Sequence, residues 1–233
     1  MRRIWALADT HLSFAQPKPM DIFGSHWKDH AARIKKNCET VIAEQDILLI
    51  PGDISWAMKR ADAEPDLEFL AGLPGTKVLC KGNHDYWWDS DRPLNYPGLY
   101  DAPFVSEDGQ VGVAGTRGWI EPSVQMNDQE RAQTNKIILR EYKRLEKRLE
   151  VIKDCPMKFA LIHYPPIPVF APLLKQYGVE TVLYGHVHLN GKDAPLSEQW
   201  HGMRALCVAC DRINFTPRLV VAQRDWEKHP TSE

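Results

Sequence analysis

Residues 76–85, with the sequence TKVLCKGNHD, join a short apolar run to three consecutive polar side chains, Asn83, His84 and Asp85. The apolar run has the length and composition of a buried strand. A turn favours Asn and Asp, because both tolerate loop conformations and form hydrogen bonds with the nearby backbone. The His between them fits neither role, and other segments of the chain repeat the same arrangement.

Five further apolar runs of about five residues are strand candidates, at residues 2–8, 46–50, 111–115, 158–162 and 180–185. Two of the intervening segments have helical patterns. Apolar residues between 27 and 42 recur at spacings of three and four, and residues 61–75 begin with charge and end in Gly and Pro. Strands that alternate with helices predict an α/β fold with a sheet buried on its helical face.

A long helix is predicted after Asn127, which forms a plausible capping pair with Glu130. Its apolar stripe covers only about two heptads, so a solvated surface helix is favoured over a coiled coil. After residue 185, two apolar runs surround a turn-like stretch, and residues 203–223 predict a terminal hairpin.

The composition is that of one folded domain spanning residues 1–233, with 43% hydrophobic and 26% charged residues. The 29 basic and 31 acidic residues give a net charge of -2, and no basic block favours a nucleic-acid partner. No run approaches the roughly 18 apolar residues of a membrane span. Five cysteines, an odd number, favour a reducing cytoplasm. The pair Cys207 and Cys210 is interpreted as part of the core, because no second pair would complete a zinc site.

Metal-ligand residue types follow five of the six strand candidates. In an open α/β sheet the carboxyl ends of the strands form the crevice where ligands bind. Side chains delivered there from five separate segments therefore predict one shared site. They are Asp9, His11, Asp53, Asn83, His163, His186 and His188.

This set offers two carboxylates, one amide oxygen and four imidazoles, which are too many ligands for one tetrahedral ion. Two ions fit better, and imidazole-rich mixtures suit transition metals. Asp9 and His11 lie two apart and share one ion if the chain is extended there. His186 and His188 either share an ion or serve two ions about 3.5 to 4 Å apart. Two divalent ions with two carboxylates form a positive centre that would bind phosphate oxygens and hold a water as hydroxide.

The ordered series D-x-H, G-D, G-N-H-D, H and G-H-x-H, spread over residues 9–188, resembles the calcineurin-like metallophosphoesterase superfamily. The resemblance implies a four-layer αββα sandwich of two mixed sheets with helices outside. It also implies two divalent ions such as Mn, Fe or Zn. One ion would be held by Asp9, His11, Asp53 and His188, and the other by Asp53, Asn83, His163 and His186.

Two residues are implied to take part in catalysis. Asp53 would bridge the two ions, and His84 would point toward the substrate, where it protonates the leaving alkoxide or stabilises charge on the phosphoryl group. Asp85 would orient the loop. The Ser/Thr protein phosphatases of this superfamily have a second Asp in the G-D-x-x-D-R-G motif, and Trp56 stands in its place here. This departure argues against a protein phosphatase.

Three other side chains lie close to these motifs. Trp87 and Trp88 either stack on a nucleobase or sugar or pack in the interior, and packing is favoured. Arg117 follows a strand candidate, where its guanidinium either binds substrate phosphate bidentately or lies in a surface loop.

The favoured function is metal-dependent hydrolysis of a small phosphorylated substrate, by in-line attack of a metal-bridging hydroxide on a mono- or diester. A nuclease of the same superfamily is one alternative, opposed by the absence of a basic surface stretch. A non-catalytic metal-binding scaffold is another, opposed because all seven ligand positions are filled.

Overall fold

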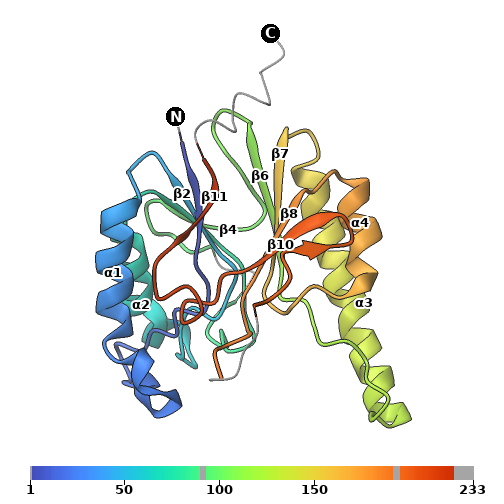
Figure 1. Ribbon diagram of the computed structural model, residues 1–233, viewed down its shortest axis with the longest axis horizontal. Helices are drawn as coiled ribbons and strands as arrows, with labels where there is room; N and C mark the ends of the chain where they lie inside the picture. The colour runs from blue at the N-terminus through green and yellow to red at the C-terminus, as the bar shows by residue number, and fades with distance from the viewer. Residues whose placement is uncertain (1, 90–92, 191–194, 223–233) are drawn as a thin grey trace.

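The computed structural model describes residues 2–89, 93–190 and 195–222, which form two mixed β-sheets with helices outside them (Figure 1). In the first sheet the central strands are parallel and only β11 runs antiparallel, beside β1. The strands of this sheet, in spatial order, are β11 (Arg218–Val221), β1 (Ile4–Ala6), β2 (Ile47–Ile50), β3 (Thr76–Leu79) and β4 (Leu99–Asp101).

The second sheet has a parallel centre and an antiparallel strand at each edge. Its strands, in spatial order, are β5 (Phe104–Val105), β6 (Val111–Thr116), β7 (Met157–Ile162), β8 (Thr181–Tyr184), β10 (Met203–Cys207) and β9 (Gln199–Trp200).

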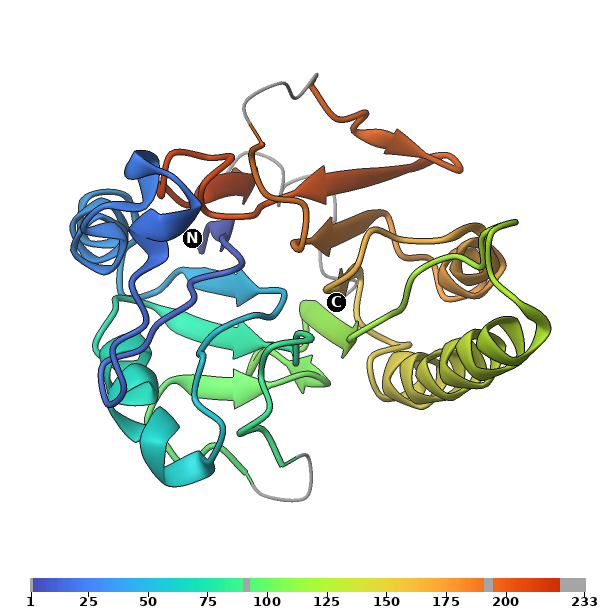
Figure 2. The same cartoon turned by 90° about the horizontal axis from the view of Figure 1, so that it is seen from below.

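Helices cover the outer face of each sheet, which gives the four layers of the expected αββα sandwich. Figure 2, seen from below the view of Figure 1, shows one pair of helices beside the first sheet and the other pair beside the second. The pairs are α1 (His30–Val41) with α2 (Arg60–Ala71), and α3 (Asp128–Val151) with α4 (Ala171–Gln176). Three short 3-10 helices are η1 (Met20–Phe23), η2 (Ser25–Trp27) and η3 (Pro168–Phe170). Among the described residues, no helix combines the length and apolar character needed to cross a membrane.

The alternation of side chains along the strands divides the core between the layers. In β2, Leu48 and Ile50 pack against the helices, whereas Ile47 and Leu49 pack between the two sheets. All four are buried, because a strand sends successive side chains to opposite faces and both faces of this sheet are covered. Continuous apolar runs such as DILLI are therefore typical of strands in this position.

The long helix begins as predicted, and its first turn is fixed by a reciprocal cap. The Asn127 side chain accepts a bond from the Glu130 amide at 2.9 Å, and the Glu130 carboxylate accepts one from the Asn127 amide at 2.9 Å. These bonds satisfy two backbone donors that the helix leaves unpaired. The apolar stripe, with Leu145 and Leu149 fully buried, packs in one cluster with residues of the second sheet and of α4.

The prediction of a terminal hairpin at residues 203–223 was wrong. β10 pairs in parallel with β8 in the second sheet, whereas β11 pairs antiparallel with β1 in the first. The connecting segment crosses between the sheets beside Ala8, whose amide donates to the Val208 carbonyl at 2.7 Å. The ten residues that join β10 to β11 are enough to span the roughly 10 Å between packed sheets. Each of the two strands therefore buries its apolar side chains as a member of a different sheet. The alternating pattern predicts strands without identifying their partners.

Candidate metal centre

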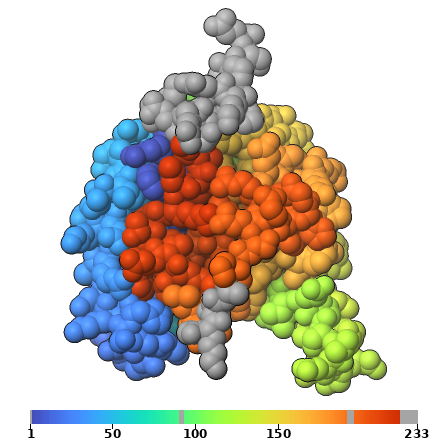
Figure 3. All heavy atoms as spheres, in the orientation of Figure 1, coloured from blue at the N-terminus to red at the C-terminus, as the bar shows by residue number. Residues whose placement is uncertain are grey.

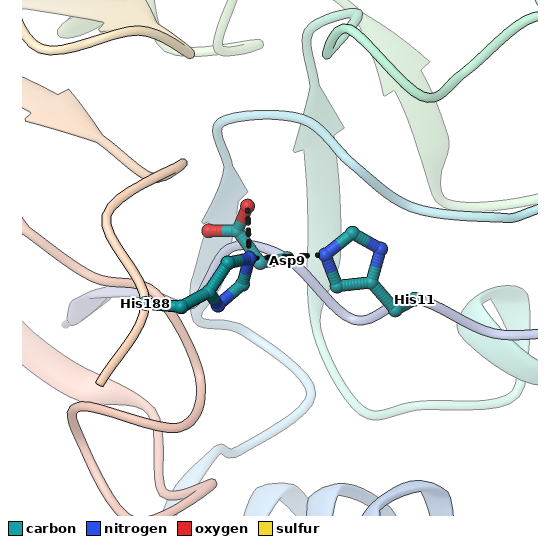
Figure 4. A group of neighbouring side chains, drawn as sticks. All are labelled: Asp9, His11 and His188. Atoms are coloured by element: carbon teal, nitrogen blue, oxygen red, sulfur yellow. Dashed lines mark hydrogen bonds and ion pairs between the residues drawn. The ribbon is translucent and has the colours of Figure 1, made fainter. Parts of the chain in front are cut away.

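The seven predicted metal-ligand residues converge at one edge of the sandwich, at the carboxyl ends of the parallel strands. Six of their side chains, all but that of Asn83, form two triads, and within each triad the potential ligand atoms lie within 4.8 Å of one another. We call Asp9, His11 and His188 the first triad, which Figure 4 shows, and Asp53, His163 and His186 the second triad. The two histidines of the G-H-x-H motif, His186 and His188, belong to different triads.

Asp53 lies between the triads. Its Oδ2 atom is 3.4 Å from Nε2 of His163 in its own triad and 4.0 Å from Nε2 of His11 in the other. The side chain is 1% exposed. A single carboxylate is therefore placed where it faces both groups of potential ligands.

The surroundings of His163 fit a cation. Its Nδ1 lies 3.0 Å from the Pro51 carbonyl oxygen, which can only accept, so Nδ1 carries the proton. Burial lowers the pKa of His163 to about 3, so the imidazole is neutral and Nε2 presents a lone pair. That lone pair faces Oδ1 of Asn83 at 2.7 Å and Oδ2 of Asp53 at 3.4 Å. Three acceptor atoms that point at one another have no hydrogen to share and fit a shared metal ion.

The first triad has a similar arrangement. Nδ1 of His188 donates to the Asp211 carboxylate at 3.1 Å, which directs Nε2 toward Nε2 of His11 at 3.2 Å. Oδ1 of Asp9 lies 3.9 Å from the same His188 atom. Asp211 was missed from the sequence, although it follows the apolar run LCVAC just as the predicted ligands follow theirs.

The backbone at the site is unusual, because Asp9, His11, Asp53 and His186 have φ angles of 58°, 43°, 51° and 66°. Residues other than Gly rarely adopt this left-handed region, and such strain concentrates at functional sites. The expectation that an extended chain aligns Asp9 with His11 was therefore wrong. Instead, their amides donate to the carbonyls of Gly52 and Asp53 at 3.0 and 3.1 Å, which fixes a turned backbone that still brings both side chains together.

Two motif glycines allow the carboxylates to approach the backbone. A Cβ atom at Gly82 would overlap Oδ1 of Asp53, and one at Gly185 would overlap Oδ2 of Asp9. The space is used by hydrogen bonds, since the amide of His84 donates to Asp53 at 2.8 Å and that of His186 donates to Asp9 at 3.1 Å. The glycine before each motif is thus required by the close packing of the site.

Electrostatics in the absence of metal are unfavourable for two adjacent carboxylates. Burial, and then repulsion from Asp53, raises the pKa of Asp9 well above its usual range, and burial also raises the pKa of Asp53. Burial lowers the pKa of His11, and that of His186 to about 4. The imidazoles are therefore neutral potential ligands, and the carboxylates lack a positive partner, which bound cations would supply.

His84 lies beside both triads without belonging to either. Its Nε2 is 4.0 Å from Oδ2 of Asp53, and its side chain is 34% exposed. Its ring packs on Trp56 at 4.3 Å between centroids, and Trp56 also stacks on His11 at 4.8 Å. The Lys18 ammonium also lies over the Trp56 ring, 3.2 Å from its centroid. Trp56 thus orients His84, in the place where the Ser/Thr protein phosphatases of the superfamily have a carboxylate.

Asp85 is fully buried and joins two loops of the site. Its Oδ1 accepts bonds from the amides of Ile54 and Ser55 at 2.8 and 3.1 Å, and its Oδ2 accepts one from the Gly82 amide at 2.8 Å. The Trp87 indole donates to it as well, at 3.1 Å. These bonds hold the loop carrying Asp53 against the loop that carries Asn83 and His84, in agreement with the orienting role inferred for Asp85.

The remaining predicted side chains lie at the margin of the site. Trp87 and Trp88 are 3% and 6% exposed, so the packing interpretation is confirmed. Arg117 is half-buried rather than free in a surface loop, and its guanidinium lies 4.6 Å from the Trp119 ring centroid.

Comparison with known proteins gives concordant results. Residues 2–190 match the model of the family described as calcineurin-like phosphoesterase. An uncharacterized protein of Methanocaldococcus jannaschii is 27% identical over 121 residues, which cover 52% of this chain and 67% of that protein.

Two solved structures are similar to this chain. A protein of unknown function from Aquifex aeolicus has 16% identity and a TM-score of 0.50, over 98% of this chain and 99% of its own. A protein from Thermus thermophilus has 19% identity and a TM-score of 0.48, over 79% of this chain and 81% of its own. The first of these supports the fold.

The family match covers most of the chain, and the two-sheet sandwich and the paired triads agree with it. The chain therefore belongs to the calcineurin-like phosphoesterase family, whose members are metal-dependent phosphoesterases and typically bind two metal ions.

Proposed function

We propose that this protein hydrolyses a phosphoester bond of a small phosphorylated substrate with the aid of two divalent metal ions. The observation that carries the proposal is the position of Asp53, whose Oδ2 faces His163 at 3.4 Å and His11 at 4.0 Å. A carboxylate between two histidine-containing triads fits a pair of ions that share one ligand.

In this proposal each triad gains Asp53 or Asn83 as a further ligand. One ion would be held by Asp9, His11, Asp53 and His188, and the other by Asp53, Asn83, His163 and His186. Two bound divalent ions polarise phosphoryl oxygens and lower the pKa of a water molecule, which provides a nucleophile at neutral pH. Mn, Fe and Zn all suit a ligand set with so many imidazoles.

The protein's own contribution to the reaction centres on His84. Burial lowers the pKa of His84 below its ordinary value of 6.5, so the imidazole is neutral at neutral pH. A neutral imidazole donates a hydrogen bond through its N–H, and Trp56 and the 2.8 Å bond from the His84 amide to Asp53 fix its position. We therefore propose that His84 stabilises charge that develops on the phosphoryl group, rather than delivering a proton from an imidazolium.

The substrate is proposed to be small because an aromatic side chain, Trp56, packs against His84. Trp56 packs on His84 and lies beneath Lys18 in the place where protein phosphatases of this superfamily have a carboxylate. Lys18 adds a positive charge close to His84 and supports binding of an anionic substrate.

The proposal is tested by measuring hydrolysis of nitrophenyl phosphate and bis-nitrophenyl phosphate with added Mn²⁺ and again with a chelator. We expect turnover of at least one ester that the chelator abolishes and Mn²⁺ restores, and the preferred ester identifies the bond class. Turnover that persists in chelator would contradict the metal requirement. Failure of both esters with two ions bound per chain would favour a non-catalytic metal-binding scaffold.

A further inference from the structure

A cavity of about 240 Å³ lies next to the candidate metal centre, between the first sheet, the second sheet and α3. Positive side chains dominate its lining, which includes a single carboxylate, that of Glu141. The five cations are Lys81, Arg117, Arg140, Arg144 and Arg148.

The cavity shares two loops with the metal centre. Lys81 lies two residues before Asn83, on the loop after β3. Arg117 follows β6, and its carbonyl accepts a bond from the Tyr164 amide at 3.1 Å, directly after His163. Since neighbouring strands are about 4.8 Å apart, Arg117 and His163 emerge side by side from the same sheet edge. The cavity therefore flanks the side of the centre formed by Asn83 and His163.

The single carboxylate does not neutralise this cavity. Glu141 is fully buried and accepts bonds from Arg144 at 2.8 and 2.9 Å and from Arg140 at 3.2 Å. Among the residues that the structure describes, Lys81 and Arg148 donate to backbone carbonyls, those of Trp88 at 2.8 Å and Gly115 at 2.6 Å. Carbonyl oxygens satisfy donors but carry no compensating charge, so several cations remain in excess.

Arg117, which lines the cavity, has a hydrogen-bond donor that is unpaired in the described part of the chain. Its Nε atom is buried and has no hydrogen-bond partner among the residues that the structure describes. Burial also lowers the pKa of Arg117 and of Arg148, which reflects the cost of holding cations away from water. A buried donor without a partner is unfavourable unless a ligand completes its bonds.

We infer that this cavity binds a second phosphate group of the substrate while the scissile phosphoryl group lies at the metal centre. The inference rests on the proposed function and narrows it to compounds that carry two phosphates. Guanidinium groups bind phosphate oxygens bidentately, and Arg117 and Lys81 approach from two loops. A volume of 240 Å³ equals roughly eight water molecules at about 30 Å³ each, which leaves room for a phosphate and some hydration.

The basic surface continues outward along α3. A second hollow of about 510 Å³ shares Arg140, Arg144 and Arg148 with the cavity and adds Lys136, Lys143 and Lys147. Figure 3 shows the segment around the start of α3 projecting from the body of the molecule. This exposed stripe is the region that a polyanion such as nucleic acid would contact, whereas the half-buried Arg117 favours a compact phosphate.

The first test measures binding of inorganic phosphate to the full chain, stripped of metal by chelator, by titration calorimetry. We expect Arg117→Gln to weaken binding about tenfold, because a charge-assisted hydrogen bond is lost. Lys81→Gln, on another loop, should act in the same direction. The matched control Lys136→Gln removes the same charge from the outer hollow and should change the Kd by less than about twofold. No phosphate binding at millimolar concentration, or equal weakening by Arg117→Gln and Lys136→Gln, would overturn the inference.

The second test uses the metal-loaded chain with nitrophenyl phosphate and a nucleoside 3′,5′-bisphosphate. The ratio of kcat/KM for the bisphosphate to kcat/KM for nitrophenyl phosphate should fall about tenfold in Arg117→Gln and remain within about twofold in Lys136→Gln. An unchanged ratio in Arg117→Gln would show that Arg117 serves no second phosphate.

The two tests separate the inference from the proposed function. Metal-dependent hydrolysis of nitrophenyl phosphate without an Arg117-dependent preference for the bisphosphate would support the proposed function and contradict the inferred phosphate site in the cavity. Arg117-dependent phosphate binding without any ester hydrolysis would support phosphate binding in the cavity and contradict the proposed function. Displacement of phosphate by a short oligonucleotide with a steep salt dependence, lost in Lys136→Gln, would assign the surface to a polyanion instead.

Discussion

The two triads of the candidate metal centre differ in the groups that support their imidazoles. In the first triad, His188 donates its Nδ1 proton to the carboxylate of Asp211 at 3.1 Å. In the second, His163 donates to the neutral Pro51 carbonyl at 3.0 Å. A carboxylate behind an imidazole increases its basicity and strengthens the metal bond, whereas a carbonyl only fixes the tautomer.

The charges near the triads differ in the same direction. The first triad has Asp9, with Asp53 and Asp211 close by, whereas the second has Asp53 and the neutral amide of Asn83. We therefore expect the first triad to hold its ion more tightly. The two triads contain similar side chains but are expected to differ in metal affinity, because residues outside the triads set the charge around each of them.

The largest effect should follow from removing the group that both triads share. Asp53→Asn deletes the carboxylate between His11 and His163, so both ions should be lost together and hydrolysis should fall by about 10³-fold. Metal analysis of dialysed protein and the rate on nitrophenyl phosphate measure the two effects. The exposed control Asp154→Asn changes charge equally and should retain both metal and activity. Retention of two ions by Asp53→Asn would show that the triads are independent.

The next effect separates metal binding from chemistry. His84→Ala should keep both ions, because His84 belongs to neither triad, yet lower kcat by about 10²-fold through lost charge stabilisation. The factor should be similar for nitrophenyl and alkyl phosphates if His84 acts as a neutral donor. A much greater loss for the alkyl ester, whose leaving group needs a proton, would instead identify His84 as a general acid.

A smaller effect tests the inequality of the triads directly. Asp211→Asn keeps a hydrogen-bond acceptor for His188 but removes the charge, so affinity at the first triad should fall by about 10- to 100-fold. Stepwise removal of metal with increasing chelator, followed by metal analysis, should show two separated losses in the wild type that move closer together in the variant. Unchanged steps in Asp211→Asn would refute the role of this carboxylate.

The smallest effect concerns pH. Burial, and then repulsion from Asp53, raises the pKa of Asp85 to about 7, and the pKa values of Asp9 and Asp53 are also raised. A carboxyl with a raised folded-state pKa stabilises the metal-free fold at low pH, and this contribution is lost as pH rises through about 7. His163 and His186, at about 3 and about 4, stay neutral in this range.

Metal binding should therefore release protons from carboxyl groups rather than from imidazoles. The drop in Tm caused by chelator should be larger near pH 8 than near pH 6, with about 1.4 kcal/mol per pH unit for each proton released. Thermal unfolding with and without chelator at both pH values measures this difference. A larger drop near pH 6 would contradict the account.

The sequence predicted the convergence of the site because parallel strands deliver their following residues to one sheet edge. Residue spacing left open how His186 and His188 divide between the two ions, whereas the family resemblance assigned them to different ions, and they lie in different triads. Asp211 was missed because residues 203–223 were interpreted as a hairpin with Asp211 in its turn, whereas the chain crosses from the second sheet to the first there and places Asp211 behind His188.

The basic cavity was hidden for a related reason. Arg140, Arg144 and Arg148 recur at a spacing of four and lie on one helix face, within a segment, residues 140–148, that has five basic and two acidic residues. The near-neutral charge of the whole chain conceals this local excess of positive charge. Lys81 and Arg117 join them only through the fold. A composition-based argument against a basic surface therefore holds for the whole chain and fails for this face.

Two ions that share Asp53 are proposed to carry out phosphoester hydrolysis. This proposal is tested most directly by adding Mn²⁺ stepwise to the metal-free chain while the initial rate on the preferred nitrophenyl ester is recorded. The account predicts little activity up to one equivalent, where the tighter first triad fills, and a rise that levels off at two equivalents. Full activity at one equivalent, or no activity with two ions bound, would contradict it.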